Sequence, residues 1–269
     1  LVGNRPSASL GFAERRAPRG EYACSLQRIK MNKLWVIKNQ DTALNQRLAK
    51  ELSISPILTG LLINRGFTDV PSIEKFLQCK KTSLHDPFKL KGMGKAVERI
   101  KAALRGGEKI MIYGDYDADG ISAAAILTIF LKRQAGRNVE WYLPNRLDEG
   151  YGLNMEAVRF IADRGVSLLI TVDCGTSDAE EVAYLNSRGI DTVITDHHQI
   201  QKEILPPAFC IINPQQADCD YPFKDLSGAG LADKLVMALS GDMDHRDEEF
   251  LDLVALGTVA DVAPQTGEN

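Results

Sequence analysis

The 269-residue sequence predicts an α/β fold: a parallel sheet with helices on both faces, preceded by a mostly helical N-terminal segment. Two observations predict it. Residues 34–105 have the periodicity of helices, whereas from residue 109 short β-rich runs alternate with helical stretches. These runs are mostly apolar, which is typical of parallel strands buried on both faces. We therefore expect a basic helical segment over residues 31–108 and an α/β domain over residues 109–269.

Residues 1–30 do not fit this pattern. They are rich in Arg, Gly, Pro and Ser and show neither a helical nor a strand period, so we expect a disordered or non-native extension. In the helical segment, Asp, Ser and Pro open the helices and Gly follows two of them. These signals predict helices at residues 41–52, 55–64, from 71 onwards, and at 94–105.

The α/β domain contains five β-rich runs and five helical stretches. The strands are expected at residues 109–113, 139–143, 167–172, 192–195 and 210–212. The helices are expected at residues 121–135, 154–163, 178–187, 229–240 and about 249–260. Acids and imidazoles follow the first, third and fourth strands: Asp115, Asp117, Asp119, Asp173, Asp196, His197 and His198. Because ligands bind at the carboxyl ends of parallel strands, we expect these side chains to share one crevice.

Three carboxylates alternate in the Gly-Asp-Tyr-Asp-Ala-Asp-Gly run at 114–120. They would repel one another unless a cation neutralised them. The two glycines permit a tight turn beside a ligand, and a helix starting at Ile121 would aim its N-terminal amides at the same place. A polar loop with capping Asp residues is the plain alternative. An EF-hand is excluded, because its twelfth position needs Glu and here holds Ile126.

The Thr-Asp-His-His run at 195–198 is the second strong signal. A lone His is usually structural, but two adjacent His residues at a strand end suggest a site, one facing a metal and the other a substrate. Asp173, in Val-Asp-Cys-Gly, gains weight from its similar position. Mixed Asp and His ligands suit two divalent ions, Mn²⁺ preferred and Mg²⁺ as the alternative. Such a pair supports hydrolysis of phosphoesters or phosphoanhydrides.

These motifs resemble those of the DHH phosphoesterase superfamily. Its first three motifs are similar to DYDADG at 115–120, VDCG at 172–175 and DHH at 196–198, and its fourth to LGTVADV at 256–262. Further segments resemble the RecJ branch: LHDPFKLKGMGKAVERI at 84–100, PNRLDEGYGLN at 144–154, INP at 212–214, SGAGLADKL at 227–235 and DLVALGTVADV at 252–262. The resemblance covers about residues 31–269.

The resemblance implies roles for individual residues. Asp119, Asp173, His197 and Asp261 would hold one metal ion. Asp117 and Asp173 would hold a second, with Asp115 or a water nearby. His198 would contact the scissile phosphate, with Asp196 orienting the histidines. Arg146 is a candidate phosphate contact, and a surface salt bridge is its alternative.

The implied function is 5′→3′ exonuclease action on single-stranded DNA in recombination and repair, with single-strand-binding protein as a candidate partner. Members of this branch continue into a DHH-associated domain and usually an OB-fold domain, which do not fit after Asn269. The chain therefore resembles the N-terminal catalytic lobe. The alternatives are another DHH enzyme (an oligoribonuclease, a cyclic-dinucleotide phosphodiesterase or a pyrophosphatase), a non-catalytic DNA-binding relative, or a receiver domain with an acidic pocket.

Charge and cysteine usage agree with this interpretation. Residues 1–110 carry 21 Lys and Arg against nine Asp and Glu, and residues 111–269 carry 11 against 27. The basic half suits a surface that tracks phosphates, and two solvated faces are the simpler alternative. The longest apolar run, 121–131, is too short to cross a membrane. Five scattered Cys residues without a CxxC pair indicate free thiols and a cytoplasmic protein.

Overall fold

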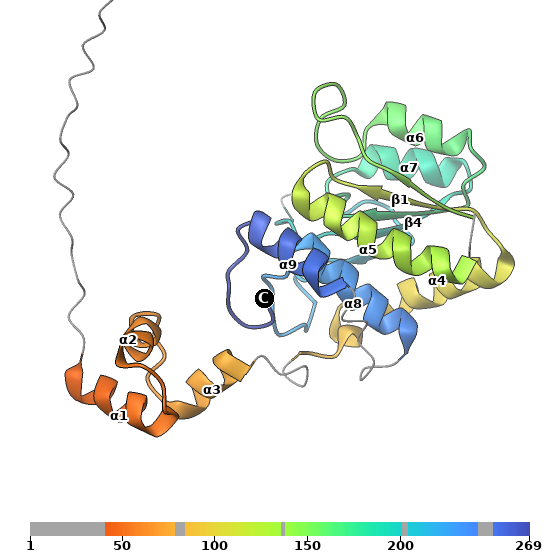
Figure 1. Ribbon diagram of the computed structural model, residues 1–269. Coiled ribbons are helices and arrows are strands. Elements are labelled where there is room, and N and C mark those ends of the chain that lie inside the picture. Colours follow the sequence, from red (N-terminus) through yellow and green to blue (C-terminus); the bar gives the residue numbers. More distant parts are fainter. Residues whose placement is uncertain (1–40, 79–83, 136–137, 201–203, 242–249) are drawn as a thin grey trace, which may run out of the picture. The chain divides into compact units, whose positions relative to one another are not determined.

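The computed structural model describes residues 41–78, 84–135, 138–200, 204–241 and 250–269 (Figure 1). The chain divides into two compact units, residues 1–74 and residues 75–269. The extension predicted at residues 1–30 lies outside the described residues. Each unit has its own hydrophobic core.

The first unit contains α1 (Thr42–Leu52), α2 (Pro56–Asn64) and most of α3 (Val70–Gln78). The predicted caps are confirmed, since Asp41 accepts hydrogen bonds from the first amides of α1 and Ser55 accepts one from an amide of α2. Leu48, Leu62 and Ile73 form a small core, one residue from each helix. Partly buried side chains pack against these three, so the three short helices share a small hydrophobic core.

The second unit is built on a five-stranded parallel sheet in the order β2-β1-β3-β4-β5. The strands are β1 (Ile110–Gly114), β2 (Val139–Tyr142), β3 (Leu168–Val172), β4 (Asp191–Thr195) and β5 (Cys210–Ile212). Strands β1 and β3 are buried at every residue. The parallel sheet predicted from the apolar runs is therefore confirmed.

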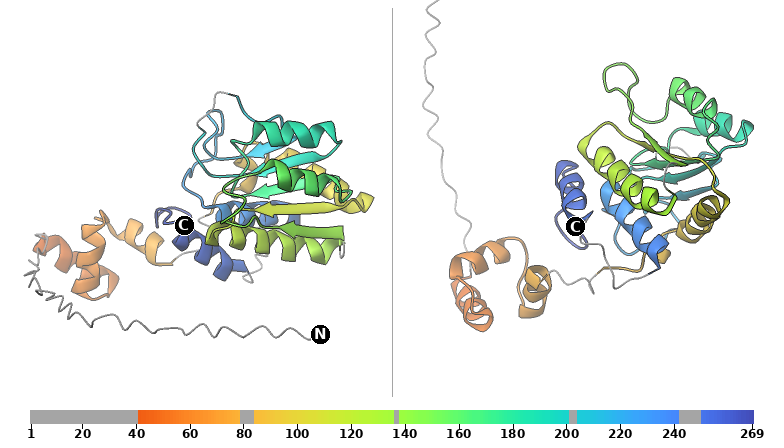
Figure 2. Two further views of the ribbon diagram at one scale, coloured as in Figure 1. Left: turned by 90° about the horizontal axis from the view of Figure 1, so that it is seen from above. Right: turned by 45° about the vertical axis from the view of Figure 1, so that its right-hand side comes forward.

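Helices cover both faces of this sheet (Figures 1 and 2). The helices of this unit are η2 (Pro87–Lys89), α4 (Met93–Gly106), α5 (Ala118–Ala135), α6 (Met155–Ala162), α7 (Ala179–Ser187), α8 (Gly228–Ser240) and α9 (Leu251–Ala260), of which α9 packs on α5 and α8. Ile110 and Ile112 of β1 face the core shared with α4, α5 and α8, whereas Met111 and Tyr113 face α6 and α7. Helix α4, predicted as part of the N-terminal segment, packs on the sheet.

The start of α5 corrects one expectation. The helix begins at Ala118 and not at Ile121, because the Asp117 side chain caps it, accepting from the amides of Asp119 (2.9 Å) and Gly120 (3.0 Å). These amides are therefore engaged and do not form an anion site. Neither Gly114 nor Gly120 has a positive φ. A Cβ at Gly120 would lie 2.6 Å from the Asp115 carbonyl oxygen, so this glycine serves a close approach and not a turn.

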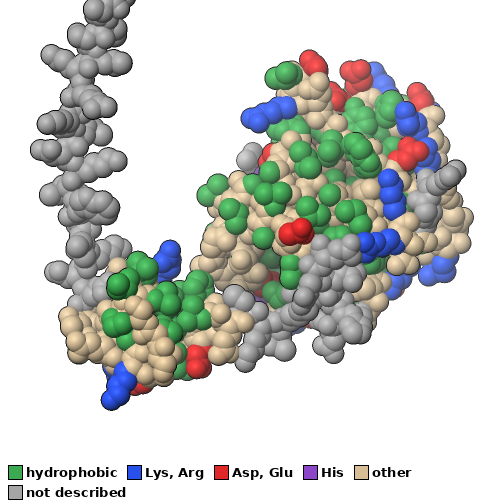
Figure 3. All heavy atoms as spheres, in the orientation of Figure 1, with side chains coloured by type: hydrophobic (Ala, Val, Ile, Leu, Met, Phe, Trp, Pro, Cys, Tyr) green, Lys and Arg blue, Asp and Glu red, His purple; other side chains and the backbone are tan. Residues whose placement is uncertain are grey.

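Hydrophobic side chains gather on the face that Figure 3 shows, over α5 and α9. On these two helices Ile121, Ile129, Leu256 and Val259 are all exposed. A helix as apolar as α9 is usually buried. Within the second unit these four side chains remain exposed. Among the same residues, no helix has the length and hydropathy needed to cross a membrane.

Candidate metal centre

The candidate site lies at the carboxyl ends of the three central strands. Gly114 ends β1 and pairs with Val172 of β3, which pairs in turn with Thr195 of β4. This register aligns the residues that follow the three strands: Asp115, Asp173 and Asp196. Parallel pairing thus places together the acids that the sequence predicted as site residues.

The six predicted metal ligands fall into overlapping groups. Candidate ligand atoms lie within 4.8 Å of one another in the sets Asp119–His197–Asp261, Asp115–Asp117–Asp173 and Asp173–His197–His198. Asp119 comes from the first turn of α5 and Asp261 follows α9. Asp173 occurs in two groups and so joins them. The structure therefore brings together every residue predicted to hold a metal.

Several buried atoms of this cluster have no hydrogen-bond partner among the described residues. They are Asp115 Oδ1, Asp173 Oδ1 and His197 Nε2. The last two lie 3.1 Å apart, but not in hydrogen-bonding geometry. Buried polar atoms are normally paired, and unpaired ones are costly. Oxygen and imidazole lone pairs converging on one place fit a divalent cation.

The pKa values of these buried side chains show that the carboxylates lie close together. Burial raises the pKa of Asp173 to about 7, opposed by His197 and reinforced by Asp119. Burial alone would lower the pKa of His197, but the neighbouring carboxylates, Asp173 first, raise it to about 9. Burial also raises the pKa of Asp115. The acids repel one another's charge, and a bound cation would relieve this repulsion.

Two backbone amides of α8 hold Asp119. The Gly228 amide donates to Asp119 Oδ2 (2.6 Å) and the Ala229 amide donates to Oδ1 (2.8 Å). Burial raises the pKa of Asp119, and these two amides oppose the rise. A Cβ at Gly228 would lie 2.6 Å from Asp173 Cβ, and one at Gly257 would lie 2.5 Å from Asp119 Oδ1. Only glycine therefore fits at either position without moving a carboxylate.

The contribution of α8 was not predicted as part of the site. The signal was the Ser-Gly-Ala-Gly run at 227–230, in which Ser227 caps the helix through the Gly230 amide. The Ser227 hydroxyl also lies 3.0 Å from that of Thr258 in α9. This contact links α8, which holds Asp119, to the helix that precedes Asp261.

Asp196 belongs to none of the metal-binding groups and instead orients its neighbour. Its Oδ1 accepts from the amide of His198 (3.1 Å) and lies 2.8 Å from His198 Nδ1, while its Oδ2 accepts from the Thr176 amide (3.0 Å). The hydrogen bond to Asp196 raises the pKa of His198. The His198 side chain is 45% exposed, so it faces outward, whereas His197 faces the cluster.

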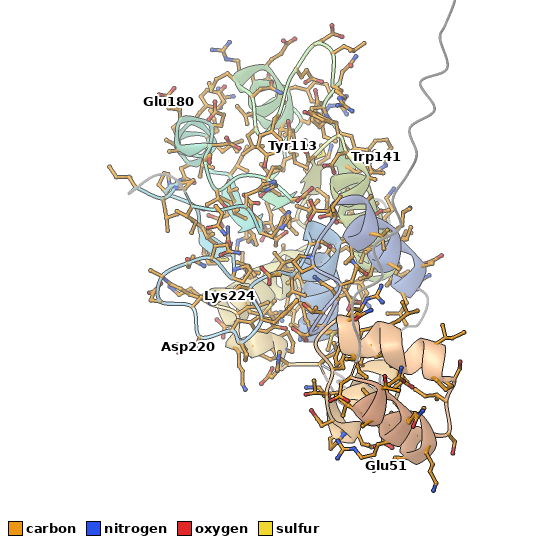
Figure 4. The ribbon with its side chains drawn as sticks, turned by 90° about the vertical axis from the view of Figure 1, so that its left-hand side faces the viewer. Glu51, Tyr113, Trp141, Glu180, Asp220 and Lys224 are labelled. Atoms are coloured by element: carbon orange, nitrogen blue, oxygen red, sulfur yellow. The ribbon has the colours of Figure 1, made fainter. Side chains whose placement is uncertain are left out.

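The loop between β2 and α6 borders His198. The Tyr151 hydroxyl lies 3.0 Å from His198 Nδ1. Tyr113, which Figure 4 labels within the sheet, donates to the Gly152 carbonyl (2.8 Å) and steadies this loop. Arg146 is exposed, with its guanidinium 5.4 Å from the centroid of the Tyr116 ring. No ion pair of Arg146 occurs among the described residues, and its predicted phosphate contact stays a prediction.

The DHH family, N-terminal domain, matches residues 109–258. The single-stranded-DNA-specific exonuclease RecJ of Bacillus subtilis (strain 168) is 43% identical over 235 residues, which are 87% of this chain and 29% of the relative. The crystal structure of RecJ in complex with Mn²⁺ from Thermus thermophilus matches with a TM-score of 0.68 and 31% identity, over 87% of this chain and 32% of that one. The corresponding Mg²⁺ complex matches with a TM-score of 0.57 and 27% identity, over 87% and 29%. The chain thus spans about a third of the length of these relatives.

Proposed function

Since this chain belongs to the DHH family and, within it, to the RecJ branch, we propose that it is the catalytic part of a metal-dependent 5′→3′ exonuclease acting on single-stranded DNA. The similar proteins are named single-stranded-DNA-specific exonucleases, and the Bacillus subtilis relative is about three times as long as this chain. The proposal therefore concerns what these residues contribute to phosphodiester hydrolysis in the complete protein.

The observation that carries the proposal is the cluster of buried ligand atoms without a hydrogen-bond partner at the strand ends. Asp115, Asp173 and His197 direct these atoms at a common region. Exposed acidic groups are common without an ion. Buried carboxylates destabilise the folded protein, and clusters of them with raised pKa values are typical of functional sites. The adjacent, outward-facing His198 then provides a group for the substrate.

We assign the residues to two divalent ions, for which Mn²⁺ is the preferred species and Mg²⁺ the alternative. Asp119, Asp173, His197 and Asp261 would hold one ion. Asp117 and Asp173 would hold the other, and the grouping of Asp115 with them supports a place for Asp115 at that ion. Bound ions of this kind supply an activated water and neutralise charge on the phosphoryl oxygens.

The chain's own residues orient the substrate. Asp196 Oδ1 can only accept, so it holds a proton on His198 Nδ1 and fixes the direction of the ring. Because Asp196 raises the pKa of His198, the imidazole carries positive charge more readily, which suits contact with a phosphate oxygen. Arg146, exposed on the neighbouring loop, would add a second positive charge to the same phosphate path.

Substrate, partner and location complete the proposal. Single-stranded DNA is the substrate, and single-strand-binding protein is the proposed partner, which co-precipitation of the two proteins would test. A cytoplasmic location is supported by Cys174, Cys210 and Cys219, which are free thiols. The remaining two cysteines lie outside the described residues.

The test is release of 5′ nucleotides from a labelled single strand by the complete protein with Mn²⁺. Asp173→Ala should abolish release, because Asp173 joins the metal-binding groups. Asp163→Ala is the control, since that exposed carboxylate lies 3.6 Å from Arg188, outside the site. Dinucleotides and pyrophosphate should turn over poorly. Metal-independent release, or full activity in Asp173→Ala, would contradict the proposal.

A further inference from the structure

Asn213 connects the loops behind the histidine pair. It follows β5 directly and its side chain is completely buried. Its Nδ2 donates to the His198 carbonyl (3.0 Å) and to Thr176 Oγ1 (3.3 Å). The Thr176 amide in turn donates to Asp196, the residue that orients the His198 ring. A single amide side chain thus ties together the segments that follow β3, β4 and β5.

The partners of Asn213 dictate both its orientation and its identity. The backbone N–H of Gln215 can only donate, and it donates to Asn213 Oδ1 (2.8 Å). The His198 carbonyl can only accept, so the atom facing it must be the Asn213 nitrogen. Both donors and one acceptor of the amide are therefore used in a buried place. Aspartate has the same shape, but it would place an oxygen against the His198 carbonyl oxygen.

His198 depends on this contact for its backbone position. Its ring is fixed by Asp196, whereas its carbonyl is held by Asn213. The adjacent His197 faces Asp173 and Asp119, which other elements position. A change at residue 213 should therefore move His198 without removing a metal ligand.

We propose that Asn213 is a positioning residue that sets the place of the His198 imidazole relative to the scissile phosphate. The proposal rests on the proposed function, in which His198 contacts that phosphate. Misplacing such a group costs rate, whereas the metal-holding carboxylates keep their own supports.

The first test is a double-mutant cycle in the complete Mn²⁺-loaded protein. Asn213→Asp should lower kcat on a 5′-labelled single strand about 10- to 100-fold, with little change in KM. In a His198→Ala background the same substitution should change kcat by less than about twofold, because its target is gone. Single-turnover conditions with a radiolabelled strand keep the slow background measurable. Equal losses in both backgrounds, or no loss in the first, would overturn the proposal.

Gln215→Glu is the matched control. Gln215 is half-buried, and its Nε2 donates to the Lys224 carbonyl (2.9 Å). It undergoes the same amide-to-acid change in the same loop, but only its backbone amide, which the substitution keeps, contacts Asn213. Its kcat should stay near that of the parent. Should Asn213→Asp fail to fold, Asn213→Ala takes its place in the cycle, with the same expectations.

A spectroscopic measurement separates this proposal from the proposed function. Labelling with ¹⁵N-histidine restricts the spectrum to histidine signals, to which this chain contributes four, and His198→Ala assigns the relevant one. In the Mg²⁺-loaded protein, Asn213→Asp should shift the His198 signals and Gln215→Glu should not. Unchanged His198 signals would overturn the positioning role. Absence of DNA cleavage by the parent protein would overturn the proposed function and leave this measurement valid.

Discussion

Replacing Gly228 by alanine tests whether α8 is part of the metal centre. The added Cβ would lie 2.6 to 2.7 Å from Cβ, Cγ and Oδ1 of Asp173, whereas ordinary contacts begin at 3.4 Å. Asp173 must therefore move by roughly 1 Å, although metal sites tolerate only about 0.2 Å. Its backbone, at φ 63°, offers little freedom to do so. We expect Gly228→Ala to weaken Mn²⁺ binding by about 10- to 100-fold.

The control is Gly230→Ala, two residues later in the same helix. A Cβ at Gly230 would meet its nearest neighbours at 3.4 to 3.7 Å, which is ordinary contact. Both substitutions gain helix propensity, so the control isolates the clash with Asp173. Isothermal titration gives the Mn²⁺ affinity, and thermal unfolding with and without Mn²⁺ gives the linked stability. A tenfold loss of affinity should remove about 1.4 kcal/mol of the stabilisation by Mn²⁺. Equal Mn²⁺ affinities for the two variants would refute the reasoning.

Two further predictions concern protons and a buried ion pair. Burial raises the pKa of Asp173 from 3.8 to about 7, so the folded, metal-free protein binds a proton that the unfolded chain releases at lower pH. The metal-free protein should therefore lose stability as the pH rises from about 4 to 7, while its affinity for Mn²⁺ increases. An Mn²⁺ affinity that does not change between about pH 5 and 8 would contradict this. Lys234 and Glu268 form a 2.5 Å ion pair with side chains 3% and 2% exposed, so Lys234→Met should cost about 3–5 kcal/mol of unfolding free energy in urea. Lys91→Met, which breaks the exposed pair with Asp218, should cost only about 0–1 kcal/mol, and similar losses for the two variants would be the contrary result.

The fold could be predicted because its signals are local. Continuous apolar runs identify the buried strands, and Asp41 and Ser55 identify helix starts from their immediate neighbours. The start of α5 was misplaced because Asp117 serves both as a helix cap and as a candidate ligand. Its role as a helix cap depends on the backbone conformation of the residues that follow it. The sequence pattern alone did not distinguish the two roles.

The residues of the candidate site could likewise be predicted only where their signals are local. Residues that follow a strand could be predicted, because the parallel register aligns the strand ends. Gly228 and Asn213 could not, because their partners are distant in sequence: 109 residues separate Gly228 from Asp119. Nothing near either residue indicates which side chain it will meet. These roles arise from contacts between residues that are distant in sequence, and a local sequence pattern does not indicate such contacts.

The groups that stabilise the ionised carboxylate differ between Asp119 and Asp173, which indicates different roles for the two residues. Two α8 amides oppose the effect of burial on Asp119, one on each carboxylate oxygen. They favour its ionised form and still leave each oxygen a lone pair for a cation. At Asp173 the main opposing group is His197, itself a candidate ligand. A metal bound by His197 would take that support from Asp173 and replace it with its own charge. Asp119 would then bind the metal as a carboxylate that is already ionised, whereas a proton and a metal would compete at Asp173. Gly228 lies between the two residues, because its amide binds Asp119 and a Cβ at this position would clash with Asp173.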